Sequence, residues 1–358
     1  MDKRYEALDG LRGVAAIAVL AHHVGVVGHR DLMTGGYLAV DFFFLLSGFV
    51  IALAYERAFA EGLGRLAYVR LRLERLYPMI LVGAALGVAA AFLSQMTSDM
   101  WIGLAAQLAF IPFATTQATA FPLNNPQWSL LFELVANVAH VLIWPGLTTR
   151  RLVLLVLVLG AALFGVLAVN HNLRVGWGWD NFWGGFPRVS FSFFLGVLIF
   201  RLRNRLPRIA ASYPLLLLVF AATLAVPHIA LTASDTVRDG LAVFIFFPAI
   251  LVAALSAKLT PGWRRLAAFG GAVSFPVYAI HYPLLQVAKL SDYSQGPYWM
   301  WFWIAVAAFI VAAAWTLERL YERPVLGLLR AARKRRATKA GPVRPRSAGP
   351  TGGPQVGR

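Results

Sequence analysis

The stretch LDGLRGVAAIAVLAHH, Leu8 to His23, has the apolar character of a membrane helix, yet it carries an aspartate, an arginine and two histidines. A transmembrane helix needs roughly 20 predominantly apolar residues, and this run supplies most of one. Ionisable groups inside a bilayer are costly, and they usually face a cavity or a partner. The stretch therefore predicts a membrane protein with a polar interior.

The composition supports a membrane protein. Of the 358 residues, 59% are hydrophobic and only 14% are charged, which is outside the range of ordinary soluble domains. The chain has no cysteine, so disulfide bonds, thiolate metal sites and acyl transfer through a cysteine are excluded. The net charge of +17 is concentrated in loops and in the C-terminal tail. We therefore expect contact with membrane lipids and no nucleic-acid partner.

The fold class predicted is an all-α, polytopic integral membrane protein with about ten transmembrane helices and both termini in the cytoplasm. With this count, 28 of the 33 lysines and arginines lie inside, as the positive-inside rule requires. An eleventh candidate, Trp101 to Thr116, is short and contains Pro112, so we interpret it as interfacial or re-entrant. The predicted spans are residues 8–28, 36–56, 76–97, 128–147, 151–169, 188–203, 212–230, 238–258, 266–289 and 298–321.

Two parts are predicted along the chain. Residues 1–325 form the transmembrane domain. Residues 326–358 are basic and rich in proline and glycine, without apolar periodicity, which is typical of a disordered cytoplasmic tail. Contact with anionic lipid explains the charge of this tail.

Ionisable residues recur at two predicted depths. Arg12 and His23 are eleven residues apart, so they share one helix face about 16 Å apart, with Arg12 at the cytoplasmic end. Asp41, Glu133 and His281 are expected at the depth of His23, in the outer half of the bilayer. One such residue is often a satisfied buried group, but four at one level indicate a water-accessible pocket.

Two further arginines lie at the inner side. Arg72 and Arg75 are three residues apart on one helix face. An ordinary positive-inside anchor explains such a pair. Guanidinium groups also suit phosphate oxygens, and Arg12 at the same mouth strengthens that second interpretation.

Several motifs occur in a fixed order over most of the chain. They are LDGLRG with Arg12 and His23, VDFFFLLSGFVI with Asp41 and Ser47, RLERLYP, WSLLFE from Trp128 to Glu133 with Ser129, VYAIHYP with His281, and a terminal YERP. In these motifs the chain resembles the membrane acyltransferase family 3, which includes O-antigen acetylases, nodulation-factor acetylases and macrolide acyltransferases. It departs from the family at Leu134 and at YAIH, and neither departure changes the histidine or the glutamate.

The resemblance implies an enzyme of the bacterial cytoplasmic (inner) membrane. It would move an acyl group, most often acetyl, from cytoplasmic acyl-CoA to a hydroxyl of a carbohydrate, a glycolipid or a glycosylated small molecule. No permanently bound cofactor and no metal is expected. A base is needed for hydroxyl attack, and histidine suits it near neutral pH. The expected roles are His23 as base, Asp41 or Glu133 as its orienting carboxylate, Arg12, Arg72 and Arg75 on the donor's phosphates, and Ser47, Trp128, Ser129 and His281 in the pocket.

Alternatives remain at this point. Intramembrane His, Asp and Glu also serve as proton relays, so a proton-coupled transporter or flippase for a polysaccharide precursor is the main rival. A non-enzymatic partner in polysaccharide export is a second. If the chain is an enzyme, direct transfer is the simpler assumption, but an acyl-enzyme on His23 or Ser47 is open.

Overall fold

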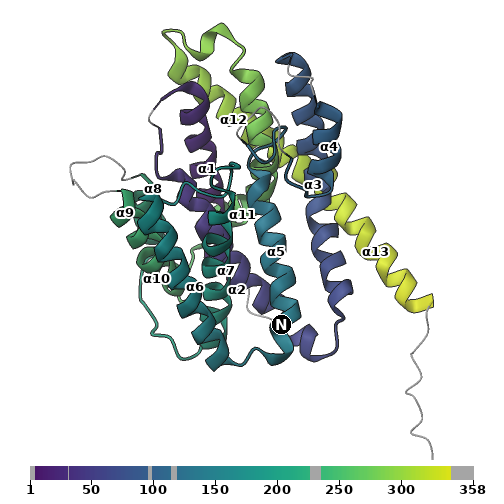
Figure 1. The fold of residues 1–358 in the computed structure, drawn as a ribbon, viewed down its shortest axis with the longest axis vertical. Helices are drawn as coiled ribbons and strands as arrows, with labels where there is room; N and C mark the ends of the chain where they lie inside the picture. The colour runs from purple at the N-terminus through teal and green to yellow at the C-terminus, as the bar shows by residue number, and fades with distance from the viewer. Residues whose placement is uncertain (1–4, 31, 96–98, 114–118, 226–234, 340–358) are drawn as a thin grey trace, which may run out of the picture.

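The protein is a bundle of α-helices, seen in a computed structural model that describes residues 5–30, 32–95, 99–113, 119–225 and 235–339 (Figure 1). Within these residues the only β-structure is an isolated bridge between Thr119 and Gly178, so the predicted all-α class is confirmed. The longer helices are α1 (Glu6–Gly28), α2 (Ala39–Ala60), α3 (Arg65–Leu93), α5 (Gln127–Ile143), α6 (Thr149–Asn170), α7 (Gly185–Leu202), α8 (Tyr213–Ala225), α11 (Pro261–Ala288), α12 (Trp299–Leu317) and α13 (Arg323–Lys339). The shorter helices are α4 (Met100–Leu108), α9 (Asp235–Leu241) and α10 (Phe247–Ala254).

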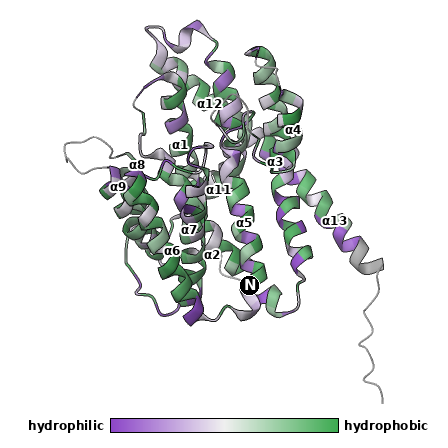
Figure 2. Ribbon diagram, viewed as in Figure 1, coloured by the Kyte–Doolittle hydropathy of each residue, from purple (hydrophilic) through white to green (hydrophobic). Residues whose placement is uncertain are grey.

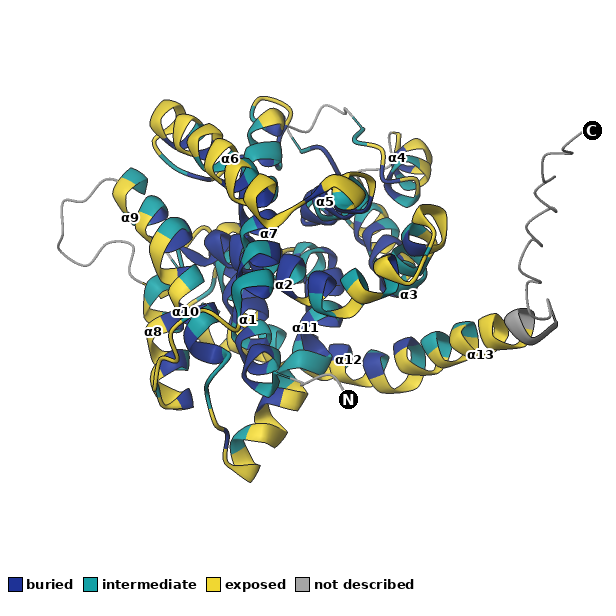
Figure 3. Cartoon of the chain, turned by 90° about the horizontal axis from the view of Figure 1, so that it is seen from below, coloured by how far each residue is buried: buried dark blue, intermediate teal, exposed yellow. Residues whose placement is uncertain are grey.

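The helices have the lengths and the apolar surfaces of a multi-pass membrane protein. Eight helical segments of the described chain are long and apolar enough to cross a bilayer. Two predicted spans are not among these eight segments. One is α11, which has 28 residues and lies at the centre of the bundle. The other is α8, an apolar helix of 13 residues, and residues 226–230 of that predicted span lie outside the described residues. Large apolar side chains such as Val158 and Trp301 are exposed. The helices are largely hydrophobic in Figure 2, and those at the outside of the bundle have exposed faces in Figure 3. These faces are suited to lipid.

The chain before α5 sets the depth at which α5 begins. α4 has nine residues, about 14 Å, which is too short to cross a bilayer. The side-chain amide of Gln127 donates to the carbonyl of Gln107 on α4 (2.5 Å), and that of Asn124 donates to the carbonyl of Ala279 (2.8 Å). Ala279 lies eighteen residues into α11. α5 therefore begins beside an interior turn of α11, about two thirds of the way along that helix, rather than at the end of the bundle.

Close approaches of the backbone hold the two main helix pairs. A Cβ on Gly13 of α1 would lie 2.6 Å from the Cα of Gly270 on α11. A Cβ on Gly48 of α2 would lie 1.9 Å from the carbonyl oxygen of Phe193 on α7. Both sites require glycine, and small residues of this kind let membrane helices pack closely. The α1–α11 pair brings distant parts of the sequence together at the centre of the bundle.

The core consists of two hydrophobic clusters. One includes residues of α1, α3, α11 and α12, and the other gathers most of α2, α5, α6, α7, α8 and α10. Phe43 and Phe275 pack against both clusters.

Two segments differ from the sequence-based expectation. α3 begins at Arg65, so the basic segment before residue 76 is helical rather than a loop, and α3 carries Arg72 and Arg75. After α12, a π-helical turn over Glu318–Glu322 leads into α13. Residues 326–339 of the predicted disordered tail are therefore helical, while residues 340–358 lie outside the described part of the chain.

Candidate active site

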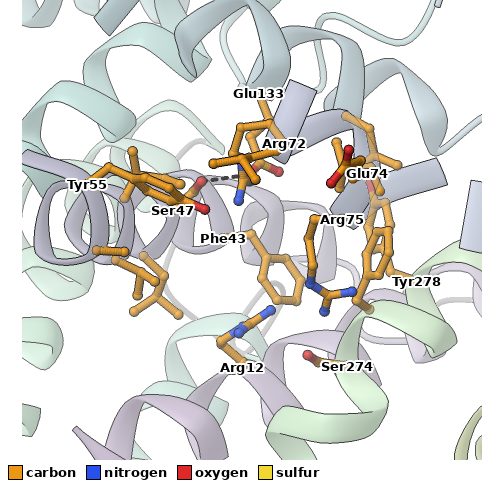
Figure 4. Close-up of a pocket in the computed structure, with 18 of the residues that line it drawn as sticks. Arg12, Phe43, Ser47, Tyr55, Arg72, Glu74, Arg75, Glu133, Ser274 and Tyr278 are labelled. Carbon is orange, nitrogen blue, oxygen red and sulfur yellow. Dashed lines mark hydrogen bonds and ion pairs between the residues drawn. The ribbon is translucent and has the colours of Figure 1, made fainter. Parts of the chain in front are cut away.

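A cavity of about 490 Å³ opens between α2, α3, α5, α11 and α13, with Arg12 reaching it from α1 (Figure 4). Its wall includes the three arginines predicted for the inner mouth. Ser47, Ser129 and Glu133 line it as well. The other lining residues that carry the argument are Phe43, Glu74, Ser274, Tyr278, Arg330 and Arg333.

The arginines and Glu133 form one charged group. Arg72 Nη2 lies 3.0 Å from Glu133 Oε1, and Ser47 Oγ donates to the same oxygen at 2.6 Å. Arg75 pairs with Glu322, which is buried. Arg72 Nε is buried and has no hydrogen-bond partner in the described structure, and Arg12 forms no ion pair with the described residues. The arginines can therefore donate hydrogen bonds to further anionic oxygens.

His23 and His281 form a second group, which lies beyond the cavity. His281 Nδ1 faces the carbonyl oxygens of Tyr278 (2.8 Å) and Val277 (3.0 Å). Because carbonyls only accept, this nitrogen carries the proton, and Nε2 of a neutral His281 presents its lone pair. That lone pair lies 3.2 Å from His23 Nδ1, which is also 3.0 Å from the carbonyl oxygen of Val19. His23 Nδ1 is therefore the donor, and His23 Nε2 is left unprotonated.

The end of the cavity and the histidine pair are one helical turn apart. Tyr278 lines the cavity and precedes His281 by three residues on α11, about 4.5 Å along the helix. The Tyr278 hydroxyl contacts Ser129 Oγ at 2.6 Å and donates to the carbonyl of Pro126 at 3.0 Å. The Phe43 ring lies 6.0 Å from the Tyr278 ring, centroid to centroid. Phe43 and Tyr278 thus stand between the arginines and the imidazoles.

Asp41 is held away from both groups. Arg188 donates to both of its carboxylate oxygens, at 2.7 to 3.0 Å. The same guanidinium donates to the carbonyls of Tyr37 (2.8 Å) and Val175 (3.0 Å). Both side chains of the ion pair are essentially inaccessible, at 0% and 1%. This geometry is that of a buried structural ion pair, and Trp128 packs against its guanidinium (5.3 Å) rather than facing the cavity.

The expectation that His23, Asp41, Glu133 and His281 share one pocket is therefore wrong in its geometry. His23 and His281 meet, but Glu133 joins the arginines and Asp41 joins Arg188. Glu133 was placed too far out because α5 was assumed to begin at the membrane surface. No group of His, Cys, Asp or Glu with the arrangement of a metal site occurs among the described residues.

Sequence reasoning missed several groups at the site. Arg188 is the first residue of the predicted span 188–203 and has no place among the expected site residues, although an arginine inside the apolar run GGFPRVSFSFF indicates a buried charge that needs a partner. Tyr278 and Glu322 lie within the motifs VYAIHYP and YERP, and their contacts come from distant helices. Arg330 and Arg333 were assigned to the tail, so their place in the cavity wall was not anticipated.

The structure is thus a closely packed helical bundle with an arginine-lined interior cavity and a histidine pair one turn beyond it. Comparison with known proteins identifies its family. The family described as "Acyltransferase domain" matches residues 5–319. The chain therefore belongs to the membrane acyltransferase family 3, and it is an acyltransferase.

Two of three relatives carry names that agree with this assignment. The chain is 34% identical to "Protein 2 in picA locus" of Rhizobium radiobacter over 187 residues, covering 47% of this chain and 96% of that protein. It is 35% identical over 78 residues to a putative O-acetyltransferase of Staphylococcus aureus (strain COL), 21% of this chain and 12% of the relative. It is 32% identical over 145 residues to the acyltransferase MdmB of Streptomyces mycarofaciens, 36% of each. No solved structure matches the chain significantly.

Proposed function

We propose that the protein transfers an acyl group, most often acetyl, from cytoplasmic acyl-CoA to a hydroxyl of a carbohydrate or glycosylated acceptor in the bacterial cytoplasmic membrane. The observation that carries the proposal is the arginine-lined cavity that ends one turn from His281, whose imidazole contacts that of His23. Family membership and relatives named as O-acetyltransferases support it. The same membership favours an acyltransferase over the transporter considered from sequence.

The donor is the first part of the proposal. Arg12, Arg72 and Arg75 line the cavity, and guanidinium groups bind phosphate oxygens through paired, charge-assisted hydrogen bonds. Acyl-CoA carries its phosphates at one end and its thioester at the other. Arg12 and His23 are eleven residues apart on α1, about 16 Å, so an extended pantetheine arm running along α1 would carry the thioester from the arginines toward His23.

The second part is the proton transfer. The acceptor hydroxyl would attack the thioester carbonyl carbon while His23 Nε2 takes its proton. The tetrahedral intermediate then collapses, the C–S bond breaks, and the sulfur of CoA leaves with the proton returned from the imidazolium. The lone pair of His281 Nε2 and the carbonyl of Val19 face His23 Nδ1–H, so they hold the ring in the required tautomer.

In this proposal the orienting role considered for Asp41 or Glu133 passes to His281. Glu133 instead would position Arg72 and Ser47, both of which it contacts. Ser47 remains a candidate to touch the donor, because it lines the cavity with its oxygen held at 2.6 Å from the carboxylate. Direct transfer needs no covalent role for it.

The test uses purified protein in lipid nanodiscs, acetyl-CoA labelled in the acetyl group, and a mixture of carbohydrate acceptors analysed by mass spectrometry. His23→Ala should abolish transfer while donor binding persists. Arg72→Gln with Arg75→Gln should weaken donor binding first. Normal turnover by the His23 variant would overturn the mechanism, and failure of the unaltered protein to bind acetyl-CoA would overturn the donor.

A further inference from the structure

Helix α13 contributes a wall of the cavity. Leu326, Leu329, Arg330 and Arg333 line it, and their spacing of three, four and seven residues places them on one helix face. All four lie beyond residue 319, where the match to the acyltransferase family ends. Family membership therefore assigns no role to these residues.

Contacts with α3 hold this face toward the cavity. Glu322, just before α13, pairs with Arg75. Arg333 Nη1 lies 3.7 Å from Glu74 Oε2, and Glu74 also accepts from Arg70 at 2.8 Å. Arg330 makes no hydrogen bond or ion pair with another residue of the described chain, so its five donors are available to a ligand.

The charge of the cavity wall favours a polyanion. Five arginines line it against two glutamates, which leaves an excess of three positive charges. Arg330 and Arg333 lie eight and eleven residues beyond Glu322, about 12 and 16 Å farther along the helix than the ion pair with Arg75. The arginines that line the cavity are thus spread along it, and α13, which runs outward from the bundle in Figure 3, supplies two of them.

We infer that Arg330 and Arg333 bind the terminal phosphate monoester of the donor, the 3′-phosphate of the adenosine end of acyl-CoA. The inference rests on the proposed donor. With the thioester directed inward, the pyrophosphate comes next at Arg72 and Arg75, and the 3′-phosphate is the anion farthest out. A phosphate monoester carries up to two charges and three acceptor oxygens, which suits two guanidinium groups one turn apart. α13 therefore gives the enzyme its selectivity for the complete coenzyme.

The experiment compares acetyl-CoA with acetyl-3′-dephospho-CoA, which lacks only this phosphate, by calorimetry on the full chain in nanodiscs. The unaltered protein should bind acetyl-CoA about tenfold more tightly, as expected for charge-assisted hydrogen bonds to one phosphate. In Arg330→Gln/Arg333→Gln, affinity for acetyl-CoA should fall to that for the dephospho donor, and affinity for the dephospho donor should stay the same.

The control is Arg319→Gln/Arg335→Gln, which removes the same charge from the same end of the protein without touching the cavity lining. It should keep the tenfold preference. A preference retained by the α13 variant, or lost equally by the control, would overturn the inference. The other possible source of a phosphate is a lipid headgroup, so the measurements are repeated in nanodiscs with and without anionic lipid. If the α13 variant keeps its preference for acetyl-CoA and loses only its binding of anionic lipid, the site binds a headgroup and the inference fails. Absence of acetyl-CoA binding by the unaltered protein would instead refute the donor itself.

Discussion

Removing one partner of the Asp41–Arg188 ion pair is expected to cost a large part of the stability of the bundle. Both side chains are buried, and three N···O contacts of 2.7 to 3.0 Å join them. Asp41→Ala would leave the guanidinium without a counter-charge, which typically costs about 3–5 kcal/mol. In Asp41→Leu/Arg188→Met no charge stays buried, so part of the loss is recovered. The carbonyls of Tyr37 and Val175 still lose their donor, at about 1 kcal/mol or more each.

The assay is thermal unfolding of the purified protein, followed by fluorescence-detected size exclusion, with acyl transfer measured well below the midpoint. Asp41→Ala should lower the midpoint on the order of 10 °C, and the double variant should unfold between it and the unaltered protein with transfer activity retained. If Asp41→Ala unfolds at the original temperature, the ion pair is not structural as argued. If the double variant is folded but inactive, the Asp41–Arg188 pair acts in the reaction and is not only structural.

Three other substitutions test separate parts of the structure. His281→Ala should lower kcat about five- to tenfold at unchanged donor affinity, because one hydrogen bond of about 1 kcal/mol to His23 is lost. His281→Gln should recover most of the rate, because the amide oxygen of glutamine accepts the same proton. Equal rates in the two variants would refute the role of His281 in orienting His23. Phe43→Trp should slow turnover with little change in donor binding if the acyl arm passes that ring, whereas unchanged steady-state kinetics would mean that it does not. Gly48→Ala should lower the thermal midpoint by several degrees, because its Cβ would meet the Phe193 carbonyl; an unchanged midpoint would contradict the α2–α7 packing.

Local periodicity was enough to predict the arrangement of groups that share a helix. Arg72 and Arg75 are one turn apart on α3, and Arg12 and His23 share a face of α1. Helical geometry alone fixes such relations within one helix. The three arginines were expected at the same inner side of the membrane, and all three line one cavity. The spans of most helices followed in the same way from apolar runs of bilayer length.

Relations between helices could not be predicted, because they depend on where each helix begins in depth. Glu133 lies six residues into α5, but α5 starts beside Ala279, eighteen residues into α11. Glu133 is therefore near the arginines, while His281, two residues after Ala279, is near His23. The Asp41–Arg188 pair joins residues 147 apart, and no sequence pattern within either helix identifies the partner. α13 was missed because its basic composition resembles that of a disordered tail.

The most direct test of the central claim is a structure of the His23→Ala variant in nanodiscs with acetyl-CoA bound, determined by electron cryomicroscopy. The account predicts phosphate density at Arg72, Arg75 and α13, and an extended arm that passes Phe43 so that the thioester carbonyl ends beside position 23. A thioester that stops at Ser47 and Glu133, or a donor bound outside the arginine-lined cavity, would contradict it.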